Sequence, residues 1–189
     1  MHGQNSCGSI FRFNSTESDR GFLCPFARYI TFMQNKEFFM SAAICEAQKA
    51  YAIGETPVGA VVVKDGEIIS RAHNLRETGK NALYHAEILA IDAACKVLGG
   101  WRLHQCDLYV TLEPCIMCSG AIVQARIKNL FYGATDPKGG AVSSIVNIPG
   151  LDKLCHHPNC EGGILADECS SLLKEFFHDL RCWLTPPIK

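Results

Sequence analysis

The chain lacks the features that mark membrane-spanning, secreted or fibrous proteins. None of its stretches reaches the roughly 20 consecutive apolar residues that a membrane-spanning helix needs. Its first residues carry no basic segment leading into an apolar one, so no secretory signal is predicted. It also has no internal repeat and no low-complexity tract. A globular protein remains, and we expect it in the cytoplasm.

The chain also lacks an excess of either charge. Its 18 lysines and arginines nearly balance 19 aspartates and glutamates, which gives a formal net charge of -1. This balance argues against a protein that coats nucleic acid by bulk electrostatics. A local basic groove is still compatible with it, so composition alone leaves the partner open.

Cysteine, in contrast, is abundant, with 11 residues. An odd number scattered along the chain is unlike the even, closely spaced cysteines of small disulfide-bonded domains. A chain of 189 residues buries enough surface, roughly 70%, to fold without disulfides. We therefore predict small buried apolar side chains in a reducing compartment for four cysteines in apolar segments: Cys45, Cys95, Cys169 and Cys182.

Hydrophobic patterning predicts one domain of alternating helices and strands. Residues 1–35 show no sustained period and are interpreted as an N-terminal extension outside a domain of residues 36–185. The predicted helices are Glu37–Ala52, His85–Leu98, Pro114–Gln124 and Ala166–Leu180, and the predicted strands are Val58–Val63, Ile68–Ala72, Asp107–Thr111 and Asn129–Tyr132. Residues 134–162 are predicted to form a long functional loop. The alternation indicates the α/β class, as a three-layer αβα sandwich with one central mixed sheet of about five strands.

Two short motifs carry the candidate chemistry. His85-Ala86-Glu87 begins the second predicted helix, and Pro114-Cys115-Ile116-Met117-Cys118 begins the third. Thiolate and imidazole are preferred zinc ligands, and a catalytic zinc takes three protein ligands with its fourth position open. Two cysteines three residues apart at a helix start point their sulfurs the same way, where the positive end of the helix favours thiolates. We predict one zinc ion per subunit, held by His85, Cys115 and Cys118.

Glu87 is the predicted catalytic residue. Two positions after His85 on a helix, it is poorly placed to share the metal and well placed beside the attacking water. A carboxylate there can take a proton and deliver it to a ring nitrogen and to departing ammonia. Either motif alone is weak, since C-x-x-C also occurs in structural zinc sites and redox pairs. Together and in this order they are the known signature of the zinc deaminases.

Further stretches match one branch of that superfamily. They are Glu55–Ala60, Ala72–Asn74, His85–Glu87, Trp101–Leu103, Tyr109–Cys118, Gly133–Gly140, Gly163–Leu165 and Phe176–Arg181. Over roughly Phe38–Arg181 the chain resembles the bacterial tRNA-specific adenosine deaminases. The Thr-Leu-Glu-Pro-Cys-x-Met-Cys form and the aromatic C-terminal helix distinguish this branch from the deaminases of free bases and of the riboflavin pathway.

The resemblance implies a fold, a reaction and partners. The fold is cytidine deaminase-like, and the enzyme is a hydrolase of a carbon–nitrogen bond in a cyclic amidine. It would convert adenosine to inosine at the wobble position of a tRNA, expected to be an arginine tRNA. A homodimer is implied, in which neighbouring subunits complete each tRNA site. A wobble base lies in a single-stranded loop, so moving it into a pocket costs only a few kcal/mol.

The resemblance also implies eight substrate-binding positions, all carried over from the family. They are Asn74 for the target adenine, Pro57 and Val58 as pocket walls, Asp136, Lys138 and His156 in the later loops, and Phe177 and Arg181 on the C-terminal helix. The chain departs from the family pattern at Tyr84, directly before the zinc histidine, and at Pro149-Gly150. For Glu113, before the cysteine motif, we expect a structural hydrogen-bonding role.

Two other functions stay open at the level of sequence. One is a deaminase of a free nucleobase or nucleoside, such as guanine, cytosine or cytidine, which would need a closed pocket without a basic rim. The other is a non-catalytic RNA-binding module with a structural zinc, which would have no use for Glu87. A second metal site around Cys155, His156, His157 and Cys160 is a weaker alternative to a simple loop.

Overall fold

A computed structural model describes the backbone of residues 25–184 and the side chains of residues 36–182. Predictions for residues 1–24 and 185–189 lie outside this part of the chain. The described helices are α1 (Pro25–Ala52), α2 (Ala86–Leu98), α3 (Ile116–Gln124) and α4 (Ala166–Leu184). The strands are β1 (Gly59–Lys64), β2 (Glu67–His73), β3 (Cys106–Leu112), β4 (Asn129–Ala134) and β5 (Asn159–Gly162).

The five strands form one mixed sheet in the order β2-β1-β3-β4-β5. The hairpin β1–β2 and the pair β1–β3 are antiparallel, whereas β3–β4 and β4–β5 are parallel. Strands β3 and β4 therefore end at the same edge of the sheet. The predicted fold class, a three-layer α/β sandwich around a mixed sheet, is confirmed.

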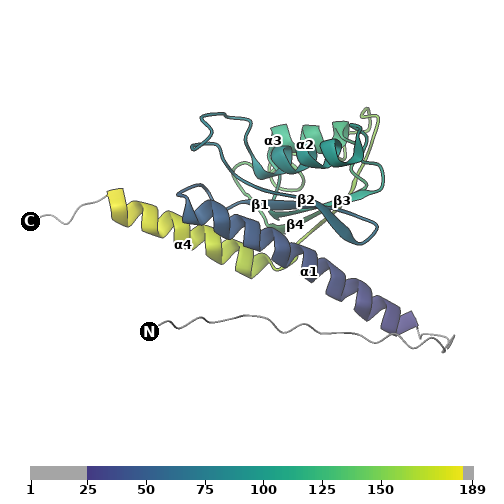
Figure 1. Ribbon diagram of the computed structural model, residues 1–189, viewed down its shortest axis with the longest axis horizontal. Coiled ribbons are helices and arrows are strands. Elements are labelled where there is room, and N and C mark those ends of the chain that lie inside the picture. The colour runs from purple at the N-terminus through teal and green to yellow at the C-terminus, as the bar shows by residue number, and fades with distance from the viewer. Residues whose placement is uncertain (1–24, 185–189) are drawn as a thin grey trace, which may run out of the picture.

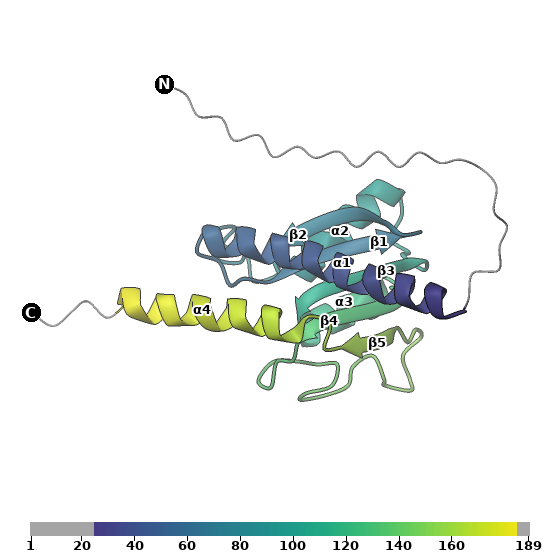
Figure 2. The ribbon, with the colours of Figure 1, turned by 90° about the horizontal axis from the view of Figure 1, so that it is seen from below.

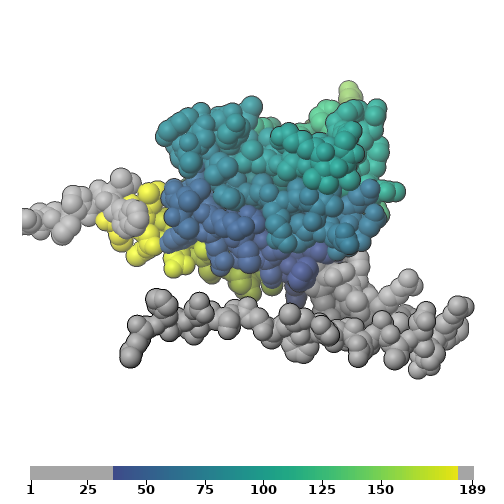
Figure 3. Space-filling model, in the orientation of Figure 1, coloured from purple at the N-terminus to yellow at the C-terminus, as the bar shows by residue number. Residues whose placement is uncertain are grey.

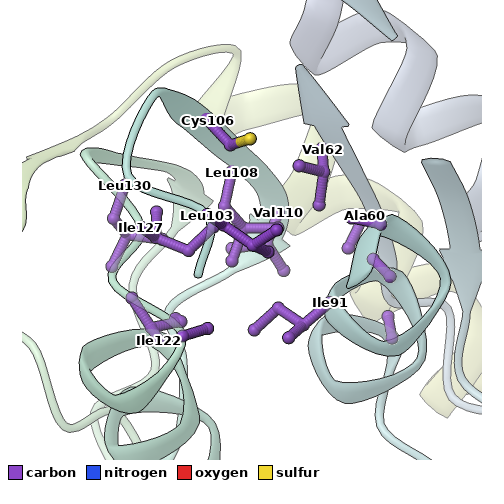
Figure 4. Close-up of a cluster of buried hydrophobic side chains, with 14 of the residues drawn as sticks. Ala60, Val62, Ile91, Leu103, Cys106, Leu108, Val110, Ile122, Ile127 and Leu130 are labelled. Carbon is purple, nitrogen blue, oxygen red and sulfur yellow. The ribbon is translucent and has the colours of Figure 1, made fainter. Parts of the chain in front are cut away.

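Helices cover both faces of the sheet (Figure 1). Helices α1 and α4 lie together on one face, and α2 and α3 lie on the other. Figure 4 shows the core on the second side, where Ile91 of α2 and Ile122 of α3 point toward Leu108 and Val110 of β3. The view turned by 90° shows α4 running past the end of the sheet, and its later turns project beyond the body in the space-filling view (Figures 2 and 3).

Strand β1 is buried on both faces, as its run of β-branched residues predicts. Its first residue, Gly59, lies directly against α1, and a Cβ atom there would lie 2.0 Å from the carbonyl oxygen of Ala43. Only glycine allows helix and strand to approach this closely. The residues that we predicted to share one face of α1 are all buried: Phe39, Ala43, Ala47 and Ala50.

The predicted element boundaries need three corrections. Helix α1 begins at Pro25 rather than near Glu37; a proline suits a first helical position because it has no N–H to lose. Helix α3 begins at Ile116 with Cys115 as its N-cap, which leaves Pro114 outside the helix. The predicted loop of residues 134–162 ends in strand β5, whose residues are all exposed.

The cysteines are free thiols wherever the structure describes them. Of the four predicted to be buried, only Cys169 is buried and Cys95 is half-buried. Cys45 on α1 and Cys182 on α4 are exposed, so the prediction was wrong for these two: an apolar local sequence does not decide which side of a helix faces the core. None of the described helices is long and apolar enough to cross a membrane.

Candidate zinc and substrate site

Two helix starts bring the three predicted metal ligands together. His85 is the N-cap of α2, and Cys115 is the N-cap of α3, directly after β3 and two connecting residues. The His85 Nδ1 atom lies 3.8 Å from Cys115 Sγ and 3.6 Å from Cys118 Sγ. Among the described residues, this trio is the one group of His, Cys, Asp or Glu side chains close enough to share a metal ion.

The geometry and the donor chemistry of the trio fit zinc. A tetrahedral zinc with ordinary bond lengths would hold a nitrogen and a sulfur ligand about 3.6 Å apart. The two N–S distances are 3.6 and 3.8 Å, and all three donor atoms lie within 4.8 Å of one another. Two thiols and one imidazole are the set that zinc prefers, and three ligands are the number of a catalytic site.

The two cysteines differ strongly in acidity. Hydrogen bonding with Cys118 lowers the pKa of Cys115 to about 4; burial opposes this, and hydrogen bonding to His85 supports it. The same sulfur–sulfur contact, together with burial, raises the pKa of Cys118. The pKa of His85 is raised by its hydrogen bond to Cys115. The surroundings of Cys115 therefore favour its thiolate, which is the form in which a cysteine binds zinc.

Glu87 lies in the first turn of α2, buried with 4% exposure. Burial raises the pKa of its carboxyl group above the ordinary value. Its side chain lines the same pocket as His85 and Cys115. Glu87 therefore lies in one pocket with His85 and Cys115, and its catalytic role stays a prediction.

The pocket beside the ligands has a volume of about 130 Å³. Val58 and Asn74, two of the predicted base contacts, line it, and Asp136 lies at its edge toward the loop after β4. Pro57 is buried and is not among the lining residues. The lining residues are Thr56, Val58, Asn74, Arg76, His85, Ala86, Glu87, Leu112, Glu113, Cys115 and Asp136.

A second, larger groove of about 710 Å³ shares three walls with the pocket: Thr56, Leu112 and Asp136. Lys138, Phe177 and Arg181 line this groove, so four of the predicted RNA contacts, including Asp136, come together from the loop after β4 and from α4. Phe176 is buried and Phe177 is 43% exposed, so the adjacent aromatic residues divide between core and groove.

Glu113 organises the loop after β4, as expected. Its Oε1 accepts hydrogen bonds from the main-chain N–H groups of Val142, Ser143 and Ser144, and Oε2 accepts one from Asp136 N at 3.1 Å. Burial would raise the pKa of Glu113, but these bonds and the Ser144 hydroxyl outweigh it and lower the pKa to about 2. An ionised carboxylate therefore holds Asp136 at the pocket.

His156 lies apart from the residues that line the pocket and the groove. Its Nε2 atom contacts the carbonyl oxygen of Ile127, at 2.6 Å, just before β4. The pocket lies at the other end of the parallel strands, beyond Leu112. Cys155, His156, His157 and Cys160 do not form a described metal cluster, so the weaker alternative of a second site finds no support among the described residues.

Sequence reasoning missed several residues that face the site. Thr56 and Arg76 line the pocket, and Ser170 and Lys174 line the groove. A signal for Lys174 was present, since it lies three residues before Phe177 and seven before Arg181, on one helix face. Arg76 stands two residues after Asn74 in a loop, where no periodicity points to it.

Comparisons with known proteins agree with this geometry. Residues 33–134 match the family described as the cytidine and deoxycytidylate deaminase zinc-binding region. The chain is 50% identical over 149 residues to the tRNA-specific adenosine deaminase of Bacillus subtilis, covering 79% of this chain and 92% of that one. It is also 50% identical over 146 residues to the tRNA-specific adenosine deaminase of Aquifex aeolicus, covering 77% and 96%.

A solved structure from studies of A-to-I editing by tRNA:A34 deaminases at the wobble position of transfer RNA superposes with a TM-score of 0.70. Its sequence is 46% identical, and the match covers 72% of this chain and 99% of that one.

Proposed function

Because the chain belongs to the tRNA-specific adenosine deaminases within the cytidine and deoxycytidylate deaminase zinc-binding family, we propose that it hydrolyses adenosine to inosine at the wobble position of a tRNA. One observation supports this above the others: the pocket that contains Glu87 shares lining residues with a groove lined by Lys138, Phe177 and Arg181. Basic and aromatic side chains are the groups that hold an unpaired RNA strand.

We propose that His85, Cys115 and Cys118 hold the zinc and that Glu87 moves the protons. When bound, zinc supplies a strong lowering of the pKa of water, from 15.7 to about 7, so that water can act as a nucleophile near neutrality. Glu87 takes the proton from the attacking water and delivers it to a ring nitrogen of adenine. It then takes the remaining proton from the hydroxyl group now bonded to C6 and passes it to the 6-amino group, so that the C6–N bond breaks, ammonia leaves and the C6 carbonyl forms.

The remaining residues bind and orient the RNA in this proposal. Asn74 and Val58 hold the target base, while Asp136 and Lys138 contact the nucleotides beside it. Phe177 and Arg181 of α4 meet the anticodon loop. His156 lies away from this chain's own pocket, so we expect it to contact RNA that is bound by the neighbouring subunit of a homodimer. We expect the substrate to be an arginine tRNA and the enzyme to act in the cytoplasm.

The test incubates the zinc-loaded protein with an arginine tRNA anticodon stem-loop bearing adenosine at the wobble position. Free adenosine, cytidine and guanine are assayed in parallel, and inosine and ammonia are measured. We expect inosine in the RNA alone, and none with Glu87→Ala. Ammonia from a free base with untouched RNA would preserve the zinc chemistry and refute the RNA substrate. Activity retained by Glu87→Ala would refute the role of Glu87.

A further inference from the structure

Glu55 is a buried carboxylate next to the substrate pocket that does not line it. Its side chain has no exposed surface, and its backbone is fixed because its N–H donates to the carbonyl of Ala50 at the end of α1. Oε2 accepts a hydrogen bond from Asn74 Nδ2 at 3.0 Å, and Oε1 accepts one from the main-chain N–H of Thr78. Glu55 therefore joins the end of α1 to the loop that carries Asn74 and Arg76.

This contact decides which way the Asn74 amide faces. An ionised carboxylate only accepts hydrogen bonds, so the NH₂ group of Asn74 must face Glu55 and its oxygen must face away. Burial would raise the pKa of Glu55, but hydrogen bonds from Thr78 and the charge of Arg76 outweigh it and lower the pKa, so the carboxylate is ionised.

The Asn74 oxygen is consequently left for the substrate. Its amide makes no described hydrogen bond other than the one to Glu55. Every fully buried side-chain oxygen or nitrogen in the described part of the chain has a partner, so the unpartnered Asn74 Oδ1 must reach accessible space. Asn74 lines the pocket of about 130 Å³ beside Glu87 and His85, and that pocket is the space it faces.

We propose that Glu55 is a positioning residue, which fixes the Asn74 amide with its oxygen turned into the pocket to accept a hydrogen bond from the bound nucleoside. The proposal rests on the deamination proposed above and assigns one side of base recognition to a residue that never touches the substrate. A neutral glutamine at position 55 could offer an NH₂ group to Asn74 and so allow the amide to turn over.

The experiment is a double-mutant cycle with the zinc-loaded enzyme and the RNA stem-loop. We expect Glu55→Gln to lower kcat/KM roughly 10-fold, the effect of one charge-assisted hydrogen bond. In an Asn74→Ala background the same change should alter kcat/KM less than about twofold, because interacting residues are not additive. Equal losses in both backgrounds, or no loss in either, would overturn the proposal. Wild-type enzyme that makes no inosine would refute the deamination instead.

A matched control exists near the start of β3, at the end of the strand that lies away from the pocket. There, Asp107 Oδ1 accepts a hydrogen bond from Asn129 Nδ2 at 2.6 Å, which is the same pair of groups far from the pocket. Asp107→Asn should leave kcat/KM unchanged, while melting temperature and zinc content are followed for all variants.

A measurement on the wild-type protein covers the case in which Glu55→Gln does not fold. The Asn74 side-chain amide signal, identified by its loss in Asn74→Ala, should exchange with solvent far more slowly than an exposed asparagine amide. Exchange as fast as that of an exposed amide would also overturn the proposal.

Discussion

The three metal ligands differ in how the protein holds them. Cys118 has no exposed surface, whereas His85 and Cys115 are half-buried at the pocket. A buried thiol has few alternative positions, so Cys118 contributes a fixed corner of the site. A serine there would be a much poorer zinc ligand, because zinc in such sites binds thiolate and imidazole.

Cys118→Ser is therefore expected to reduce bound zinc from about one per chain to near zero and to abolish deamination. Zinc content by elemental analysis of the purified protein measures the first effect. Cys45→Ser, which alters an exposed cysteine on α1, is the control and should keep its zinc. Stoichiometric zinc in Cys118→Ser would mean that the metal is held elsewhere.

A second residue-scale prediction concerns Tyr51 on α1, whose hydroxyl donates to Asp179 of α4 at 2.6 Å. This hydrogen bond, with lesser effects of burial and nearby charge, raises the pKa of Tyr51 from 10.0 to about 12. The neutral phenol is the favoured form. Its contribution to stability is thus complete below about pH 10 and is lost as the pH rises through about 12.

Phenolate absorbance during a pH titration, with the curve of Tyr51→Phe subtracted, should give a midpoint near 12 for the wild type. In Asp179→Ala the midpoint should return toward 10, because the acceptor is gone. Circular dichroism shows over which pH range the helices persist. A wild-type midpoint near 10 in folded protein would contradict the contact between α1 and α4.

At the scale of elements, the loop after β4 depends on a single side chain. Glu113 accepts hydrogen bonds from four main-chain N–H groups of that loop, and the loop carries Asp136 to the pocket. Gly140 packs against this carboxylate so closely that a Cβ would lie 2.4 Å from it. The loop is therefore organised by an anchor from β3 rather than by its own regular structure.

Glu113→Gln should loosen this loop, because an NH₂ group then faces main-chain donors and leaves at least one unsatisfied. We expect a loss of about 1–3 kcal/mol in the free energy of unfolding, with faster amide exchange at Val142, Ser143 and Ser144. Glu161→Gln, which removes an exposed carboxylate paired with Lys36, should cost less than about 1 kcal/mol. Similar effects of the two changes would show that Glu113 is not the anchor.

The residues of the zinc site could be predicted from the sequence better than the strand and the hydrogen bonds that surround the site. The zinc ligands and Glu87 could be found because the reaction restricts residue type and spacing at two helix starts. Strand β5 could not, because Asn159–Gly162 has one apolar residue, Cys160, and no alternation, and it is a strand only through its pairing with β4. The partners of Glu55 and Glu113 lie 19 to 31 residues away, a separation that no local pattern encodes.

For the whole molecule, the net charge of -1 conceals a local concentration of positive charge. Lys138, Lys174 and Arg181 line one groove beside the pocket. If each neutralises one phosphate of single-stranded RNA, the logarithm of the binding constant should fall with the logarithm of salt concentration with a slope of about -2.

Lys174→Ala should lower RNA affinity and reduce this slope by about 0.7. Binding of the stem-loop by fluorescence anisotropy over a series of salt concentrations measures both effects. Lys96→Ala, which removes an exposed lysine paired with Asp92 on α2, should leave the slope unchanged. If the slope of Lys174→Ala equals that of the wild type, the groove does not contact the phosphates.

The pocket and the groove lie side by side, but different segments of the sequence build the zinc site and the groove. The zinc ligands and Glu87 come from residues 85–118, whereas the groove beyond Asp136 is built largely by the last helix. We therefore expect substitutions in α4 to change which RNA is bound without changing the zinc ligands or Glu87. This arrangement allows related enzymes to diverge in their RNA substrates through substitutions in the last helix, while the residues of the zinc site are inherited unchanged.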